Sequence, residues 1–314
     1  MNNFKKVGLT ALAGSLLATS AYAGAMSVAG SASIGVKNNS GSSAHGKSWT
    51  MGNQLTFSGS GETDGGINVS LSFVIDQGDD ATTGIANAPF DSHSLTLSTD
   101  SMGTLVFSGE GGSSAQSTLD GTAAGDIWDN GFGISSPSAS EAGNNSMMYT
   151  LPSLMDDLTI QASYSPGGAG GPSASAIGFT YAGVEGLSVS YGAGQTETVG
   201  SEADATTIKG SYAYGSFTFG LSQTDYDRDS TNDDEVSSYK ISYTVTDDLS
   251  ITYGSESHMT GGQTTDEEVE AISASFTSGG MTITAASIEA TGVDHTAGVS
   301  GEAERWKLSA SFAF

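Results

Sequence analysis

The side chains of this chain most able to bind a ligand or an ion are carboxylates, and two segments are rich in them. Residues 110–145 contain no Lys or Arg and five acidic residues: Glu110, Asp120, Asp126, Asp129 and Glu141. A second group follows much later: Asp225, Asp227 and Asp229. Carboxylate oxygens are the ligands that Ca²⁺ prefers, but the positions where an EF-hand needs Gly and Glu are Ser230 and Val236. Looser Ca²⁺ binding in the acidic segments therefore stays open as a prediction.

The residues that other kinds of site need are missing or badly spaced. The chain has no cysteine, so it offers neither a disulfide nor a thiol nucleophile. The four histidines show no zinc-site spacing, and we expect them to be solvent-exposed polar residues: His45, His93, His258 and His295. The glycine-rich segment 167–171 lacks a phosphate-loop lysine, and no acid/base pair of carboxylates is recognisable. The sequence predicts that the protein is not an enzyme and has no cofactor besides the possible Ca²⁺.

Residues 1–23 have the pattern of a secretory signal peptide. Lys5 and Lys6 precede an apolar run at 7–18, and Ala21-Tyr22-Ala23 is a small-x-small cleavage site. The apolar run is too short to span a bilayer. We therefore expect cleavage after Ala23, export across the inner membrane of a Gram-negative cell, and a mature chain of residues 24–314.

The charge of the chain is strongly one-sided. Residues 24–314 contain 7 Lys and Arg against 35 Asp and Glu, a side-chain balance of −28. Such a charge disfavours nucleic acid and anionic membrane surfaces as partners, and it favours cations. Acidity combined with 44 Gly is also typical of disorder, but disordered chains lack the regular apolar alternation that this chain has almost throughout.

A turn residue followed by an apolar, polar, apolar step recurs along the chain, as in Gly66-Ile67-Asn68-Val69 and Gly186-Leu187-Ser188-Val189. Most successive starts lie roughly 30 residues apart, which suits hairpins of two ten-residue strands. The interval from Gly103 to Asp157 is much longer and indicates one hairpin with an extra-large loop. About sixteen strands result, among them 206–214, 217–223 and 306–314.

Tight turns alternate with longer polar connections, among which we place 110–145, 224–236 and 256–268. Apolar residues occupy one face of each strand and Ser, Thr and Gln the other, with aromatic residues near the strand ends. Together these features predict an all-β fold, a transmembrane antiparallel β-barrel with its polar face toward a lumen. By strand parity five basic residues face that lumen: Lys37, Lys209, Lys240, Arg305 and Lys307. Because they are spread over four strands, we do not expect one compact basic cluster.

The final strand carries apolar residues at alternate positions and ends the chain on Phe314. It resembles the carboxy-terminal strand that outer-membrane barrels present to their insertion machinery, with Phe312 and Phe314 as the signal. Joined to the signal peptide, the hairpin repeat and the large loop after the fifth strand, it makes the whole mature chain resemble a Gram-negative general porin. The acidic, glycine-rich composition is similar to that of the alphaproteobacterial (Rhodobacter-type) branch.

This resemblance implies a multi-pass protein of the outer membrane, a sixteen-stranded barrel that forms a homotrimer and whose third loop folds inward. That loop corresponds to 110–145, so the resemblance assigns the pore constriction to its five carboxylates. In the family, acidic residues on this loop face a basic cluster on the opposite wall. The present chain departs from that pattern because it has few cations.

We expect a water-filled, cation-preferring channel for passive diffusion of small hydrophilic solutes. About sixteen strands leave an open lumen, and fixed carboxylates attract cations. The expected partners are further copies of the chain, outer-membrane lipid, the insertion machinery, and small ions and solutes, but not nucleic acid. Two alternatives remain: a solute-specific channel, which needs a row of aromatic residues in the lumen, and a non-transport exported β-protein such as an adhesin or surface-layer protein.

Overall fold

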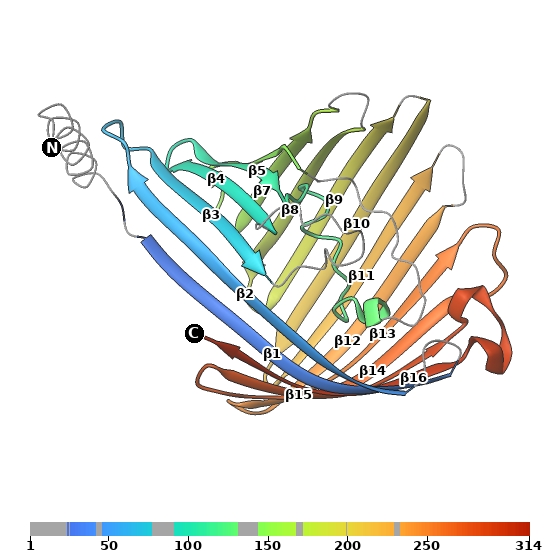
Figure 1. The fold of residues 1–314 in the computed structure, drawn as a ribbon. Helices are drawn as coiled ribbons and strands as arrows, with labels where there is room; N and C mark the ends of the chain where they lie inside the picture. The colour runs from blue at the N-terminus through green and yellow to red at the C-terminus, as the bar shows by residue number, and fades with distance from the viewer. Residues whose placement is uncertain are drawn as a thin grey trace, which may run out of the picture.

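Sixteen antiparallel strands close into one barrel in the computed structural model (Figure 1). The structure describes residues 24, 26–41, 46–76, 91–130, 144–167, 172–198, 200–228 and 233–314. The proposed signal peptide, residues 1–23, lies outside this part. Among the described residues, no helix is long and apolar enough to cross a membrane. The predicted all-β antiparallel barrel is confirmed.

The strands follow one another round the barrel, and β1 (Met26–Gly41) pairs with β16 (Ala303–Ala313) to close it. The others are β2 (Gly46–Glu62), β3 (Asn68–Asp76), β4 (Ser92–Thr99), β5 (Gly103–Glu110), β6 (Ser146–Thr150), β7 (Leu158–Ser165), β8 (Ser173–Val184), β9 (Leu187–Thr198), β10 (Ser201–Tyr214), β11 (Phe217–Arg228), β12 (Asp234–Thr246), β13 (Leu249–Thr260), β14 (Glu267–Ser278) and β15 (Met281–Thr291). Three short 3₁₀-helices complete the description: η2 (Ile127–Asn130), η3 (Val293–His295) and η4 (Gly298–Gly301).

The tight turns depend on glycine where the backbone turns left-handed. Gly103 and Gly186 have φ of +78° and +75°, a region that residues with a Cβ rarely adopt. A Cβ on Gly186 would also lie 2.4 Å from the carbonyl oxygen of Ala213. These glycines let neighbouring strands reverse within two or three residues.

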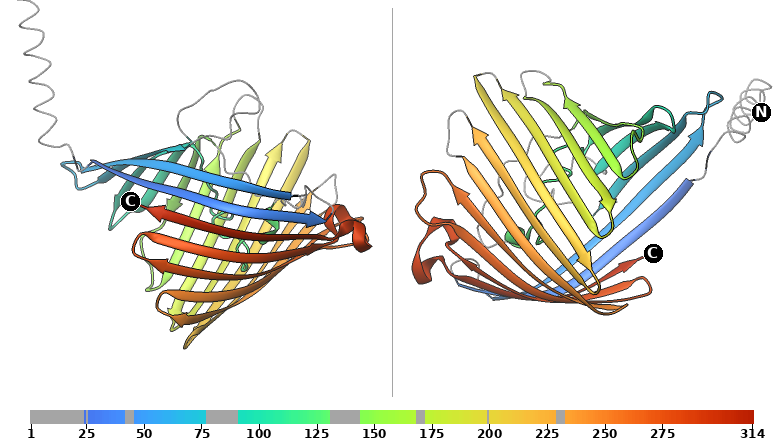
Figure 2. Two further views of the ribbon diagram at one scale, coloured as in Figure 1. Left: turned by 60° about the horizontal axis from the view of Figure 1, so that its bottom comes forward. Right: turned by 180° about the vertical axis from the view of Figure 1, so that it is seen from behind.

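Closure of the barrel involves the last residue of the chain. The amide of Gly30 donates to the carbonyl oxygen of Phe314 at 2.7 Å, and the amide of Phe314 donates to the carbonyl oxygen of Gly30 at 2.9 Å. A Cβ on Gly30 would lie 2.3 Å from the ring of Phe314, so the ring covers the glycine. Figure 2 shows β1 and β16 side by side at this junction.

Many strands extend farther from the tight turns than the sequence predicted. β10 begins at Ser201 and β11 continues to Arg228, so Asp225 and Asp227 lie in a strand and not in a loop. The apolar alternation stops before the strand does. Beyond the apolar band the outer face meets polar surroundings, and outward positions there are acidic although the backbone pairing continues.

An outer acidic band results on β9–β16, at the strand ends far from the tight turns. Its members share the face of the exposed apolar residues: Glu197, Glu202, Asp204, Asp225, Asp227, Glu235, Glu268, Glu270, Glu289 and Glu304. Several are direct partners on neighbouring strands, such as Glu197 with Glu202 and Asp204 with Asp227. A large part of the negative charge therefore lies outside the barrel.

Candidate functional site

The segment 111–130 lies inside the barrel against the wall, as Figure 1 shows. Groups between residues 115 and 124 donate hydrogen bonds of 2.8 to 3.0 Å to hydroxyls on four strands: Ser163 on β7, Thr207 on β10, Ser222 on β11 and Ser238 on β12. All four belong to the face opposite the exposed apolar residues. This inner segment narrows the lumen along half of its circumference.

Glycines on the lumen face make room for the inner segment. A Cβ on Gly178 would lie 2.5 Å from the carbonyl oxygen of Ala115, and one on Gly254 would lie 2.7 Å from Cβ of Ala124. Glycine weakens a strand interior and often marks a close approach of another backbone. Glycines at lumen-facing positions of the strands therefore indicate where the inner segment approaches the wall. The sequence analysis did not use this signal.

Replacing Gly254 by Val should force the inner segment away from the wall and lower the single-channel conductance. Overpacking of this kind costs about 1–3 kcal/mol, which the segment relieves by moving into the lumen. Gly210→Val is the matched control, because Gly210 lies on the outer face and its nearest non-neighbouring atom to a Cβ is 3.9 Å away. Equal conductance of the two variants in planar bilayers would contradict this role of Gly254.

Two carboxylates of the inner segment lie beside a lumen lysine. Lys209 on β10 donates from Nζ to the carbonyl oxygen of Gly121 and interacts electrostatically with Asp126 and Asp120. Burial, and to a smaller extent the neighbouring Asp126, raise the pKa of Asp120 to about 6, although Lys209 opposes the shift. The side chain of Lys240 packs over Gly220, with Cγ 3.2 Å from where a Cβ of that glycine would lie, and is the second cation near this cluster.

A second basic group lies on β1 and β16. Lys37 and Lys307 are direct partners across the two strands, and Arg305, two residues from Lys307, donates from Nε to Oδ1 of Asn39 at 2.7 Å. These three residues, which the sequence placed on the first and last strands, come together because closure makes those strands neighbours, and with one arginine among them they form no arginine ladder. In a ring of sixteen strands, β1 lies across the lumen from β9, beside which the inner segment passes.

The five predicted constriction carboxylates have different positions. Asp120 and Asp126 lie together on the inner segment. Glu110 is the last residue of β5, with its carboxylate 4.0 Å from Nδ1 of His93, and so it precedes the inner segment. Asp129 belongs to η2, and Glu141 lies outside the described residues.

The proposed Ca²⁺ ligands do not meet in the described residues. Asp225 and Asp227 lie on the outer face of β11, Oδ1 of Asp225 accepts a hydrogen bond from Nε2 of Gln223 at 3.1 Å, and Asp229 is outside the described part. Within the ranges that the structure describes, no group of three or more His, Asp or Glu could hold a metal ion. Ca²⁺ binding stays a prediction without a described site.

One histidine contradicts the expectation of solvent exposure. His258 on β13 is buried on the lumen face, with Nδ1 3.0 Å from Oε2 of Glu267 and Nε2 3.6 Å from Oδ1 of Asp234. The amide of Asp294 also donates to Oε1 of Glu267 at 3.0 Å, which ties the last loop to the wall. The sequence misled here because 256–268 lacks apolar alternation, although β13 continues to Thr260.

A small apolar cluster lies on the lumen side of β14–β16, where a polar surface was expected. It consists of Val269, Ile288, Ala290, Val293 and Ala303, and Ile127 and Trp128 of η2 pack against it. Its strand neighbours Glu270 and Glu289 face outward. The polarity of the two faces is therefore inverted at this end of the barrel, and the inversion anchors η2.

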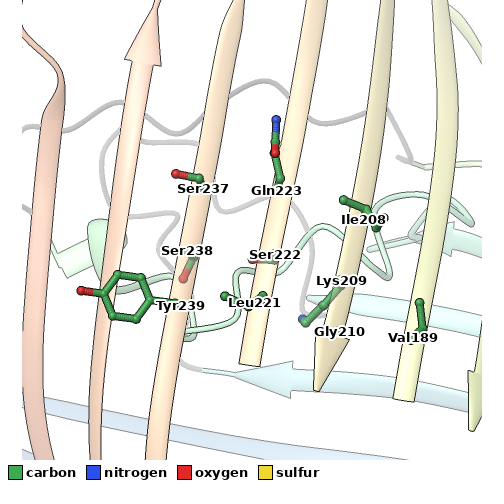
Figure 3. A pocket seen from close by; sticks show the side chains of 10 residues that line it. All are labelled: Val189, Ile208, Lys209, Gly210, Leu221, Ser222, Gln223, Ser237, Ser238 and Tyr239. Atoms are coloured by element: carbon green, nitrogen blue, oxygen red, sulfur yellow. The ribbon is translucent and has the colours of Figure 1, made fainter. Parts of the chain in front are cut away.

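A cavity of about 490 Å³ on the wall between β9 and β12 is distinct from the lumen (Figure 3). Val189, Ile208, Leu221 and Tyr239 on its lining belong to the outer face, although Lys209 and Ser222 reach it from the other side. This cavity therefore is not the route of permeating solutes, and we assign that route to the lumen beside the inner segment.

Comparisons with known proteins agree with this architecture. The barrel is similar to a loop L8 deletion mutant of OmpT, an outer membrane protein of Vibrio cholerae, with 15% identity, 92% of this chain and 99% of that chain covered, and a TM-score of 0.74. An anion-selective porin from Comamonas acidovorans has 16% identity, 92% and 99% coverage and a TM-score of 0.66. A mutant porin of Rh. blastica has 13% identity, 92% and 100% coverage and a TM-score of 0.67.

Likeness at these identities concerns the fold alone. A sequence search among curated proteins found no match. The profile of the Gram-negative porin family, by contrast, matches residues 8–314, nearly the whole chain. With its closed sixteen-stranded barrel and inner segment, this chain belongs to the Gram-negative porin family and is an outer-membrane porin.

Proposed function

We propose that this porin is a passive diffusion channel for small hydrophilic solutes with a modest preference for cations. The observation that carries the proposal is the position of Asp120 and Asp126 inside the lumen, on a segment hydrogen-bonded along the wall. Fixed carboxylates at a narrow section raise the local concentration of cations and repel anions.

The preference is modest because the lumen is less acidic than the whole chain. The two groups described above contribute five basic residues to the lumen face, and Arg228 pairs with Asp234 on the same face, while the outer acidic band lies on the other side of the wall. Solvent screens charges beyond about 8 Å at physiological ionic strength. The charge of −28 for residues 24–314 therefore overstates the field that a permeating ion meets.

General diffusion is better supported than a solute-specific passage. In the described strands, the aromatic side chains lie on the outer face except for Tyr226, which is buried on the lumen side. A row of aromatic residues along the lumen, which stepwise binding of one solute would need, is therefore not supported within this part of the chain.

We further propose that residues 1–23 are removed, that the mature chain of residues 24–314 forms a homotrimer among outer-membrane lipids, and that it belongs to the alphaproteobacterial branch. The signal pattern and the composition support the first and last points. Vibrio cholerae OmpT, 13% identical over 93% of this chain, has been solved in a trimer form, which supports the second.

Reversal potentials in planar bilayers test the proposed function. Under a tenfold KCl gradient, the purified protein should conduct and its reversal potential should have the sign of cation preference. Absence of conductance would favour the non-transport alternative. Saturating, competitive inhibition of the current by one solute class would favour the solute-specific channel.

Cation preference should fall as the pH decreases from about 7.5 to 5. Because the pKa of Asp120 is raised to about 6, its carboxylate is charged above that pH and becomes neutral below it, whereas an ordinary Asp stays charged to about pH 4. Reversal potentials at several pH values would locate the step. Asp120→Asn should abolish it, and a step that survives in this variant would assign it to another group.

A further inference from the structure

We propose that Glu256 is a positioning residue of the constriction, which fixes the turn 122–126 and thereby directs the Asp126 carboxylate into the passage. This inference rests on the proposed function. Glu256 faces the lumen from β13 and is 2% exposed. Sequence reasoning placed it in a loop and gave it no role.

Both oxygens of Glu256 bind the inner segment, one on each side of Asp126. Oε1 accepts a hydrogen bond from the hydroxyl of Thr122, and Oε2 accepts one from the amide of Trp128 at 2.8 Å. Both bonds are buried, and a buried donor left without its acceptor is costly. The carboxylate thus links the two ends of the segment that presents Asp126.

The Thr122 hydroxyl transmits this constraint to Asp126. While it donates to Glu256, this hydroxyl accepts hydrogen bonds from the amide of Gly125 at 3.1 Å and from the amide of Asp126 at 2.6 Å. The amide of Thr122 in turn donates to Oδ1 of Asp126 at 2.9 Å. The direction of the Asp126 carboxylate therefore depends on hydrogen bonds that run from Glu256 through Thr122 to Asp126.

The backbone at Asp126 makes this dependence strong. Its φ is +53°, in the left-handed region that non-glycine residues rarely adopt. Such a conformation is strained and persists only where the surrounding contacts enforce it. Without the acceptor at Glu256, the turn is expected to relax and Asp126 to leave its place.

A separate anchor keeps the rest of the segment in place. Ile127 and Trp128 pack on the apolar cluster of β14–β16, and the amides of Ala123 and Ala124 donate to Ser222 and Ser238. Loss of the Glu256 bonds should therefore change the turn without releasing the whole loop. The expected result is altered ion preference at nearly unchanged conductance.

Thr122 offers a test that changes no charge. Thr122→Val removes the hydroxyl at similar volume, and Thr122→Ser keeps it. We expect Thr122→Val to reduce the cation-to-anion permeability ratio by at least half of the change that Asp126→Asn causes, and Thr122→Ser to retain the wild-type ratio. Glu256→Ala should resemble Thr122→Val, and Glu256→Gln, which keeps one acceptor oxygen, should lie between Glu256→Ala and wild type.

A double-mutant comparison separates positioning from a general structural effect. If Thr122 acts through Asp126, Thr122→Val combined with Asp126→Asn should give the same ratio as Asp126→Asn alone. Additive changes, or a wild-type ratio in both Thr122→Val and Glu256→Ala, would overturn the proposal. Heat-modifiable migration identifies folded variants, and a wild-type protein that does not conduct would instead refute the proposed function.

Discussion

Replacing Asp120 and Asp126 together by Asn should convert the modest cation preference of this porin into an anion preference. A unit charge about 6 Å from a permeating ion changes its energy by about 0.7 kcal/mol in water, so two carboxylates raise the local cation concentration about tenfold and lower that of anions about tenfold. Their removal therefore changes the cation-to-anion ratio by up to about a hundredfold where salt screening is weak. The two basic groups of the lumen, Lys209 with Lys240 and Lys37 with Arg305 and Lys307, then dominate the passage. Adding Asp129→Asn, the third mid-loop carboxylate that the sequence predicts at the constriction, should extend the change.

The outer acidic band supplies a control with the same change in charge. Asp225→Asn with Asp227→Asn also removes two charges, but from the outer face of β11. Reversal potentials should move little in this control and most strongly in the Asp120/Asp126 variant at about 0.01 M salt, where the Debye length is about 30 Å. A larger shift from the outer pair would show that the mouth, and not the inner segment, sets the preference.

Deleting Phe314 should leave export across the inner membrane intact and abolish most of the folded barrel. The deletion removes the last pair of hydrogen bonds between β1 and β16, together with the ring that covers Gly30, while the pairing from Ser31–Ala313 to Gly41–Ala303 remains. The expected loss is therefore one of assembly, because the terminal strand with Phe314 resembles the segment that outer-membrane barrels present to their insertion machinery. The measurement is heat-modifiable migration of the outer-membrane fraction, with signal-peptide cleavage as the readout of export.

Two variants separate the ring of Phe314 from its backbone. Phe314→Lys keeps the closing hydrogen bonds, so a defect in this variant assigns assembly to the apolar side chain. Phe276→Ala is the control, because Phe276 is an outward residue of β14 with 41% exposure and takes no part in the pairing of β1 with β16. Normal folded protein from both Phe314 variants would refute the assembly role of the terminal residue.

Strand number and face could be predicted from the sequence because both follow from local physics. Side chains alternate across a strand, so the outward positions of Ile208 and Gly210 predict that Lys209 between them faces the lumen. The structure agrees, because Lys209 donates a hydrogen bond to Gly121 of the inner segment. The same reasoning failed at Asp225 and His258. There the outer surface is polar, and the alternation that marks a strand disappears while the backbone pairing continues.

The sequence by itself determined the barrel and the presence of one long acidic loop, because periodicity and turn residues are local properties. Only the tertiary structure decided which charges share a space. Closure makes Lys37 the partner of Lys307, the fold of the loop brings Thr122 to Glu256, and strand parity beyond the apolar band puts the acidic band outside. These contacts join segments far apart in the chain, and no local pattern specifies the path between them.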